Sequence, residues 1–266
     1  MFQSLILFAL CAPIAPGAAP LEVSASAALV SQDTGTPDKR PEVKEMLGEL
    51  KDHIGKRGDE DREAVGVIDQ LLQEFPQSGP KDKAAIVKGL GKCFEVKRQD
   101  LEDGVKNNQL FLGAAVALGE MGEFATKTLE KWVGNKKHRK DIALQRQLIL
   151  SLGKTKDVKA VKKLLDLLND NDNVLVGATA EALSQFDGAA LKVRKEIFND
   201  LLKLMMTTKA LKDSDANDIV SREKWDVIAA PIITTLQALS GHDERKPEEW
   251  QRWWNKNKKK DWDEED

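Results

Sequence analysis

The chain of 266 residues carries 41 Lys and Arg against 44 Asp and Glu, which gives a formal net charge of −3. This balance argues against the strongly basic class of proteins that neutralise nucleic-acid phosphates. Aromatic residues make up only 5 % of the chain and tyrosine is absent, whereas Leu, Ala, Lys, Glu and Asp dominate, so the composition favours helices over sheets.

The first 25 residues resemble a cleavable secretory signal. The apolar run from Phe2 to Cys11 has the length of a signal-peptide core and is too short to cross a bilayer. Small residues that end at Ala25 or Ala27 would suit cleavage. No Lys or Arg precedes the apolar run, which leaves a disordered apolar terminus or a wrongly assigned start as alternatives. We expect an exported protein, either periplasmic or extracellular.

Residues 26–40 are small and polar and are interrupted by Pro37, which predicts a flexible linker. If Cys11 leaves with the signal, Cys93 is the only remaining cysteine, so no internal disulfide can form. Cys93 follows a leucine-rich stretch, and we expect it to be a small buried apolar side chain and not a reactive thiol. No later apolar stretch reaches the ~18 residues that a membrane span requires.

From Pro41 onward, apolar residues recur at intervals of three and four, which is the pattern of amphipathic helices. The pattern predicts a first helix over 41–54 and a second over 62–75, which ends before the breaker sequence PQSGP. Further helices are predicted over 124–133, 157–168 and 194–206.

A repeated motif accompanies these helices: a helical segment ends in a leucine that a small residue follows. The leucines are Leu90, Leu118, Leu152, Leu183 and Leu239, and the small residues are Gly91, Gly119, Gly153, Ser184 and Ser240. Successive copies are 28, 34, 31 and 56 residues apart, and the longest gap suggests an insertion over 209–225. The small residue would let a neighbouring helix approach closely. Because one helical hairpin cannot bury its apolar face alone, we predict an all-α fold, a right-handed α-solenoid of stacked antiparallel helical hairpins.

The segment AAVALGEMG, followed by a second amphipathic helix at a period of about thirty residues, resembles HEAT repeats of the short bacterial type. The resemblance covers roughly residues 60–240. The end of the chain, LQALSGHDERKPEEWQRWWNKNK, is similar to the tail of exported bacterial HEAT-repeat proteins, which are mostly of unassigned role. The family implies a non-enzymatic scaffold that binds proteins. It also leaves open a HEAT-like enzyme, either a lyase with a bilin partner or a nucleic-acid glycosylase with a basic groove.

The sequence lacks the motifs of catalytic, cofactor and metal sites. His53, His138 and His242 lie in different repeat units without the spacing of metal ligands, and we expect them to be solvated or capping residues. No nucleophile elbow, phosphate-binding loop or dinucleotide motif occurs. We therefore predict no catalytic residue, no bound metal and no cofactor.

The acidic stretch DSDANDIVSREK bears comparison with a calcium-binding loop. Asp213, Asp215 and Asn217 match the first three side-chain ligands of such a loop. Asp218 stands where the loop needs Gly, and Lys224 stands where it needs a bidentate Glu. We therefore favour an acidic turn with a helix-capping Asp, and a weak cation-binding surface protein stays as an alternative.

A basic cluster, NKKHRKD at 135–141, lies between two predicted helices. Like charges in a loop are usually solvated, and no aromatic residue is interleaved with these to stack on bases. We expect no nucleic-acid partner.

A partner surface is expected on the side of the repeat helices that faces away from the core leucines. By helical geometry it consists of Lys88, Lys92, Val116, Glu120, Leu150, Lys154, Glu181 and Gln185. Val116 and Leu150 are apolar residues at positions predicted to be exposed, which suggests a protein-binding patch unless neighbouring helices cover them. We expect one or more protein partners and a monomeric chain.

Three tryptophans near the end, Trp250, Trp253 and Trp254, fall within an arc of about 100° on one face of a predicted helix. This helix follows the last repeat, where an open stack of hairpins needs a cap. We expect the tryptophans to seal the final hairpin, with a ligand-binding platform as the alternative. The capped repeat domain is predicted to span 41–254, and 255–266 to form a mobile tail of mixed charge.

Overall fold

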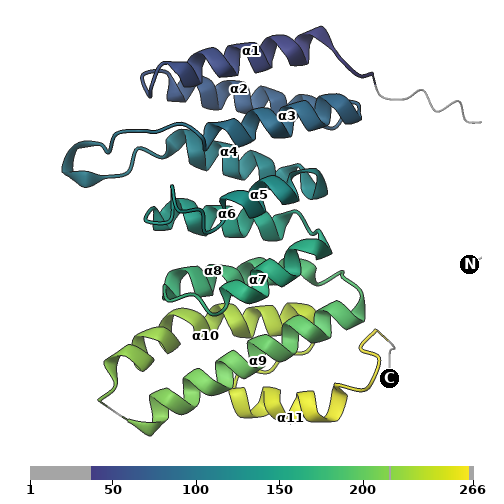
Figure 1. Cartoon of the computed structure of the whole chain (residues 1–266). Helices are drawn as coiled ribbons and strands as arrows, with labels where there is room; N and C mark the ends of the chain where they lie inside the picture. Colours follow the sequence, from purple (N-terminus) through teal and green to yellow (C-terminus); the bar gives the residue numbers. More distant parts are fainter. Residues whose placement is uncertain (1–36, 216, 264–266) are drawn as a thin grey trace, which may run out of the picture. The chain divides into compact units, whose positions relative to one another are not determined.

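The computed structural model describes residues 37–215 and 217–263, and these contain eleven α-helices and no strand (Figure 1). The all-α prediction is therefore confirmed for this part of the chain. The predicted signal at 1–25 and the predicted linker up to residue 36 lie outside the described residues, as does the end of the tail, 264–266. None of the helices in the described part is long and apolar enough to cross a membrane.

Short polar connections divide the apolar pattern into helices, and three of these begin after an aspartate whose carboxylate accepts hydrogen bonds from the first turn: Asp141, Asp172 and Asp218. In chain order the helices are α1 (Pro41–Gly55), α2 (Asp61–Glu74), α3 (Pro80–Cys93), α4 (Gln109–Glu120), α5 (Thr126–Trp132), α6 (Ile142–Lys154), α7 (Val161–Leu167), α8 (Asn173–Leu183), α9 (Leu191–Ser214), α10 (Ile219–Ser240) and α11 (Pro247–Asn257). The short 3₁₀ segments are η1 (Glu102–Gly104), η2 (Gly122–Ala125), η3 (Val158–Ala160) and η4 (Ser184–Phe186).

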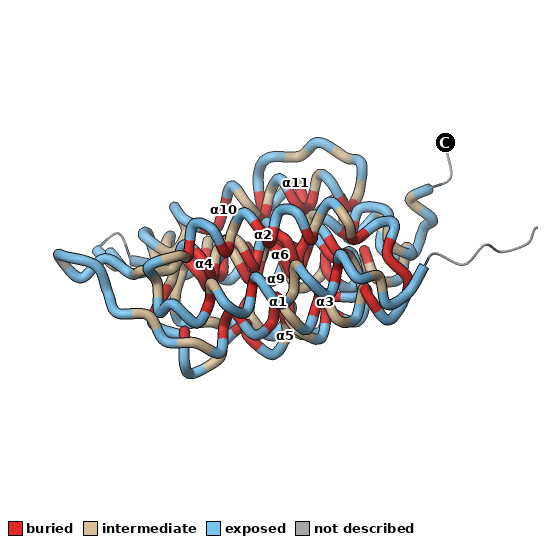
Figure 2. Tube along the Cα trace, turned by 90° about the horizontal axis from the view of Figure 1, so that it is seen from above, coloured by how far each residue is buried: buried red, intermediate tan, exposed pale blue. Residues whose placement is uncertain are grey.

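The helices pack in two layers. In one layer α2, α4, α6, α8 and α10 contact one another in that order. In the other, α1 contacts α3, α3 contacts α5, α5 contacts η3 at the start of α7, and α7 contacts α9. From α1 to α9, each odd-numbered helix also packs on the even-numbered helix that follows it, and the buried residues lie between the layers (Figure 2).

The small residues of the motif allow close approach within a layer. A Cβ added to Gly119 of α4 would lie 3.0 Å from the Cα of Ser151 in α6. A Cβ added to Gly153 of α6 would lie 2.8 Å from the Cα of Ala182 in α8. Both distances are shorter than ordinary van der Waals contact, so the predicted role of these two glycines is confirmed.

One copy of the motif lies in the other layer. Leu90 and Gly91 are in α3, whereas Leu118 and Leu152 are in α4 and α6. A Cβ on Gly91 would lie 3.0 Å from a methyl group of Thr128 in α5, the next helix of the layer that contains α3. The first copy of the motif is therefore not equivalent to those in α4 and α6. A leucine followed by a small residue allows close packing of helices within either layer.

Gly153→Ala is expected to lower the free energy of unfolding by about 2 kcal/mol, because a methyl group forced against backbone outweighs the gain in helix propensity. The added Cβ would meet the carbonyl oxygen of Ala182 at 2.5 Å. Gly66→Ala in α2 is the matched control, since nothing lies within 4 Å of its added Cβ. That variant should be stabilised by about 0.5–1 kcal/mol. Urea unfolding of both variants measures the difference, and equal effects in the two would contradict the packing at Gly153.

The stretch 209–225, predicted as an insertion, belongs to two long helices. Helix α9 continues to Ser214 and α10 begins at Ile219, where Asp218 accepts a hydrogen bond from the backbone N–H of Ser221 at 3.1 Å. The predicted insertion is therefore wrong, because the long gap between the last two motif copies comes from longer helices. The helix-capping Asp that the sequence predicted here is confirmed.

Helix α11 packs on α9 through its tryptophans. It runs through Asn257, so the predicted domain end at 254 falls inside the helix. Trp250 is fully buried, and its ring meets the ring of Phe198 edge-on with centroids 5.6 Å apart. Trp253 and Trp254 are half-buried and their rings also contact that of Phe198.

The segment after α11 lies on α9 as well. Trp262 contacts the ring of Phe198 and donates its Nε1–H to the carbonyl oxygen of Asn257 at 3.0 Å. The carboxylate of Asp263 accepts hydrogen bonds from the guanidinium of Arg194, one of them at 2.5 Å. The tail predicted to be mobile is thus packed against α9 as far as Asp263.

The last residues of the predicted linker are part of the helical fold. Asp38 accepts hydrogen bonds from the backbone N–H groups of Lys81 and Asp82 at the start of α3. In return the Asp82 carboxylate accepts from the backbone N–H groups of Lys39 and Arg40 at 3.0 Å each. The linker prediction is therefore wrong for these residues, because tertiary hydrogen bonds hold them in place.

Candidate functional site

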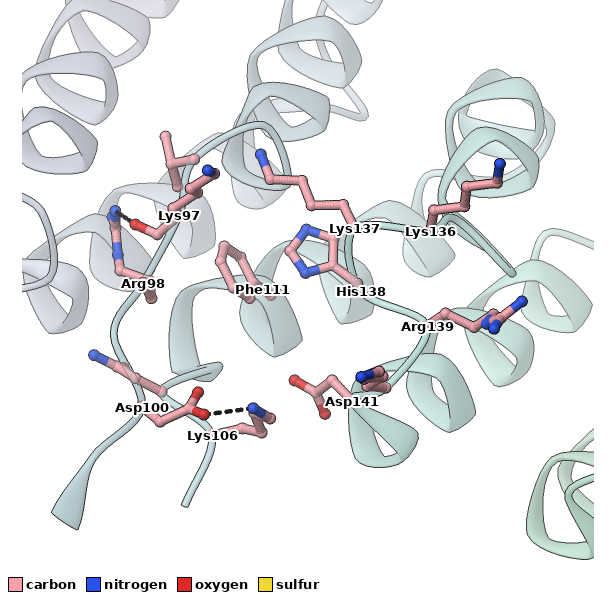
Figure 3. Close-up of a pocket in the computed structure, with 13 residues that line it drawn as sticks. Lys97, Arg98, Asp100, Lys106, Phe111, Lys136, Lys137, His138, Arg139 and Asp141 are labelled. Carbon is pink, nitrogen blue, oxygen red and sulfur yellow. Dashed lines mark hydrogen bonds and ion pairs between the residues drawn. The ribbon is translucent and has the colours of Figure 1, made fainter. Parts of the chain in front are cut away.

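A pocket of ≈550 Å³ lies where the α3–α4 loop, residues 94–108, meets the α5–α6 loop, residues 133–141 (Figure 3). Cationic side chains dominate its lining. They are Lys97, Arg98, Lys106, Lys136, Lys137, Arg139 and Lys140, against the acidic Asp100 and Asp141. The whole chain has a net charge of −3, so positive charge is gathered in this pocket.

The imidazole of His138 anchors the α5–α6 loop in the core. Its Nε2 lies 2.8 Å from the carbonyl oxygen of Phe94. A carbonyl only accepts, so Nε2 carries the hydrogen and donates it. The ring packs among the rings of Phe94, Phe111 and Trp132, with centroids 4.8 Å from Phe111 and 5.7 Å from Trp132. In Figure 3 His138 and Phe111 lie between Lys97 on one side and Lys136 and Arg139 on the other, while the side chain of Lys137 extends toward Lys97.

Buried polar side chains hold the rest of this loop. The side chain of Gln145 in α6 accepts from the backbone N–H of Gly134 at 2.6 Å and donates toward the carbonyl oxygens of Trp132 and His138 at 3.4 Å. Asp141 caps α6, and its carboxylate also accepts from the side-chain amide of Asn108 in the α3–α4 loop. The two loops are therefore tied to each other and to α6.

The α3–α4 loop is anchored by a buried ion pair. Arg98 donates from Nε and Nη2 to the two carboxylate oxygens of Asp61 at 2.8 and 2.7 Å, and both side chains are almost fully buried. Nη2 also donates to the carbonyl oxygen of Ile54 at 3.2 Å. This bidentate geometry fixes the backbone on either side of Arg98 and neutralises its charge.

The remaining cations of the pocket differ in how far they are neutralised. Lys106 pairs with Asp100 on the α3–α4 loop. Lys137 donates to the carbonyl oxygen of Glu95, and burial together with the nearby charge of Lys97 lowers the pKa of Lys137 below its ordinary value. Besides Lys137, the cations of the pocket that form no salt bridge within the described residues are Lys97, Lys136, Arg139 and Lys140. Their arrangement favours binding of an anionic group.

From the sequence we expected a solvated loop at 135–141. That prediction is wrong for His138, which is only 8 % exposed, and the same holds for the expectation that all three histidines are solvated or capping. The aromatic neighbours of His138 come from the start of the α3–α4 loop, from α4 and from α5, so no motif near 135–141 could reveal them. His53 lies beside Glu49 and Glu60, with a hydrogen bond to Glu60 that raises its pKa, and His242 stacks on Trp253.

The predicted partner surface divides into two parts. One part comprises Val116, Glu120, Leu150, Lys154, Glu181 and Gln185, and we refer to it as the α4–α6–α8 face. Lys154 pairs with Glu120, and Arg146 of α6 pairs with Glu181 at 3.0 Å, so exposed side chains of these three helices meet. Val116 is 44 % exposed, whereas Leu150 is half-buried against the core.

Lys88 and Lys92 do not belong to this face. They are exposed on α3, where they line one pocket between α3 and α5 and another between α1 and α3. The prediction of one surface through all eight residues is therefore wrong, for the same reason that the first copy of the repeat motif is not equivalent to the others.

The acidic stretch at 213–217 shows no arrangement for a cation in the part of the chain described. Asp213 pairs with Lys209, and this hydrogen bond lowers the pKa of Asp213. Asp215 accepts from the backbone N–H of Asn217 at 2.8 Å. No group of three or more His, Cys, Asp or Glu side chains that could hold a metal ion occurs among the described residues.

Cys93 is expected to be unreactive in the folded chain. Burial raises the pKa of its thiol from the ordinary value of 9.0 to about 12. At pH 8, iodoacetamide should therefore modify Cys93 about a thousandfold more slowly in the folded chain than in urea, since the thiolate is the nucleophile. The measurement uses a Cys11→Ser variant, in which Cys93 is the only cysteine that iodoacetamide can modify. The unfolded chain ionises at lower pH, so this contribution to stability is present below pH 9 and is lost as the pH rises toward 12. Equal rates in the two states would contradict the burial.

Comparison with known proteins yields no relative for this chain: no protein-family model, no curated protein and no solved structure matches it.

Proposed function

We propose that the protein is a non-enzymatic scaffold that binds a protein partner, built as a right-handed α-solenoid of HEAT-like helical hairpins. The two helical layers and the close approach at Gly119 and Gly153 support this architecture, since stacked hairpins bury a continuous core and leave an extended surface. The signal-like sequence at 1–25 supports export as part of the same proposal, which takes the chain to be a monomer.

The observation that carries the proposal is the α4–α6–α8 face. Successive helices of one layer present exposed side chains to the same surface, as the pairs Glu120–Lys154 and Arg146–Glu181 show. Exposed ion pairs contribute little to stability. The exposed side chain of Val116 beside these charges is the mixture of apolar and polar contacts that protein interfaces use.

The test compares partner capture by two variants of the full chain. Val116→Glu with Lys154→Glu changes the α4–α6–α8 face, and Val158→Glu with Lys162→Glu makes the same changes at exposed positions before and within α7. Each tagged chain is cross-linked in its own cell envelope, and captured proteins are quantified by mass spectrometry.

We expect the unchanged chain and the α7 control to recover the same partner, and the α4–α6–α8 variant to recover at least about tenfold less, because interface charges of the wrong sign weaken binding strongly. Melting temperatures of both variants must match that of the unchanged chain. Equal recovery by all three chains would refute this face as the binding surface.

A further inference from the structure

We propose that the basic pocket between the α3–α4 and α5–α6 loops binds an acidic peptide segment of the protein partner, in which carboxylates flank an apolar residue. The inference rests on the proposed scaffold function and adds the chemistry of what is bound.

The positive charge of the pocket favours a ligand with several negatively charged groups. Lys136, Arg139 and Lys140 belong to the α5–α6 loop and Lys97 to the α3–α4 loop, so both loops contribute cations without a salt bridge among the described residues to the lining of the pocket. Their spread over two loops suits a row of separate carboxylates better than one compact anion. Complementary charges of this kind raise the association rate and select the partner.

The α5–α6 loop holds its cations in a preformed arrangement. His138 ties the loop to the carbonyl of Phe94, Gln145 ties it to α6, and Asp141 ties it to Asn108. A loop that is already ordered loses less conformational entropy on binding, so a larger share of the contact energy appears as affinity.

The groove continues beyond the pocket, as an extended peptide requires. A second pocket of ≈1040 Å³ shares Val96, Lys97 and Asn107 with the first and reaches Arg57 of the α1–α2 loop. Leu101 lines this second pocket and is 54 % exposed. An exposed leucine next to cations provides an apolar contact for a side chain that lies between two carboxylates.

Two observations favour a peptide over a nucleic acid. Phe111 is only 4 % exposed and His138 only 8 %, so neither ring offers a face on which a base could stack. The positive charge also ends with these loops, since the equivalent α7–α8 and α9–α10 connections carry aspartates: Asp170, Asp172, Asp215 and Asp218. A nucleic acid that followed the same edge would meet repulsion there.

The test measures binding of a fluorescein-labelled peptide, three glutamates on either side of one leucine, to the full chain by fluorescence anisotropy. Two variant peptides show which groups contribute to affinity. One carries glutamines in place of the glutamates, and the other carries glycine in place of the leucine. A single-stranded thymidine oligonucleotide of equal charge tests the competing class of ligand.

The pocket variant is Lys136→Gln, Arg139→Gln and Lys140→Gln, and its control is Lys44→Gln, Lys162→Gln and Lys192→Gln. The control removes the same charge from exposed lysines on α1, α7 and α9. All six side chains lie on loops or exposed helix surfaces, so both variants should fold, as their melting curves will show.

We expect the acidic peptide to bind, with an affinity that falls as salt is added, that is about tenfold or more weaker in the pocket variant, and that is unchanged in the control. The glutamine peptide should not bind, and the glycine peptide should bind more weakly. Equal loss in both variants, no binding at low salt, or tighter pocket-dependent binding of the oligonucleotide would overturn the inference.

Failure of this inference can be told apart from failure of the scaffold function. The variant with Val116→Glu and Lys154→Glu leaves the pocket intact and should still bind the peptide. Partner capture that depends on the α4–α6–α8 face without any peptide binding would refute the pocket alone. Peptide binding without such capture would refute that face alone.

Discussion

Replacing Trp250 with alanine is expected to lower the free energy of unfolding by about 3–5 kcal/mol, the range for removing a fully buried aromatic side chain. Trp250 is fully buried, and its ring meets both Phe198 of α9 and Trp253 of its own helix. Truncation would leave a cavity between α11 and α9, which the surrounding rings cannot fill without leaving their packed positions. Equilibrium unfolding in urea measures the loss.

Two further variants test whether the cavity accounts for the stability lost in Trp250→Ala. Trp254→Ala removes a half-buried ring that stacks on Phe198 and should cost less than half as much. Trp250→Phe should also cost less than Trp250→Ala, because phenylalanine keeps an aromatic ring and leaves a smaller cavity. Both variants remove the indole Nε1–H, which is buried without a hydrogen-bond partner among the described residues. If Trp250→Ala unfolded at the same urea concentration as the unchanged chain, the packing of α11 on α9 would be wrong.

Arg98→Ala is expected to destabilise the chain by about 3–5 kcal/mol, because it leaves the carboxylate of Asp61 buried without its partner. The side chains of Arg98 and Asp61 are both almost fully buried and are joined by two hydrogen bonds. A loss of this size is a large part of the ~5–15 kcal/mol by which a folded domain is typically stable. Urea unfolding at neutral pH is the measurement.

The matched control removes both charges. Arg98→Met with Asp61→Leu should recover most of the stability lost in Arg98→Ala, since apolar side chains of similar volume can replace a buried ion pair at little cost. The difference between the single and double variants gives the coupling between the two side chains. A double variant as unstable as Arg98→Ala would show that packing around Arg98, and not the unpaired carboxylate, accounts for the loss.

The helical repeat could be predicted from local pattern because it depends on local spacing. Leu118, Leu152 and Leu183 each lie in the last turn of a helix of the same layer, and the glycine after two of them meets the next helix there. The same pattern at Leu90 occurs in α3, which belongs to the other layer. A leucine followed by a small residue indicates close packing in either layer. Spacing along the chain cannot tell the layers apart.

The candidate site could not be predicted in this way. His138 hydrogen-bonds to Phe94, 44 residues away, and Arg98 pairs with Asp61, 37 residues away. Neither pair lies within one helix or one turn, so no periodic pattern joins them. The sequence showed the basic cluster at 135–141 but not the buried side chains that hold it in place.

Taken alone, the amino-acid sequence determined the helical fold class, the approximate positions of most helices and the single apolar face of α11, since these follow from intrinsic propensity and from the 3.6-residue period. Only the tertiary structure decided which layer each helix joins, that Lys88 and Lys92 lie apart from the α4–α6–α8 face, and that Trp262 and Asp263 pack on α9. The physical reason is that helix formation is local, whereas burial, ion pairing and the gathering of charge depend on which distant segments the packing brings together.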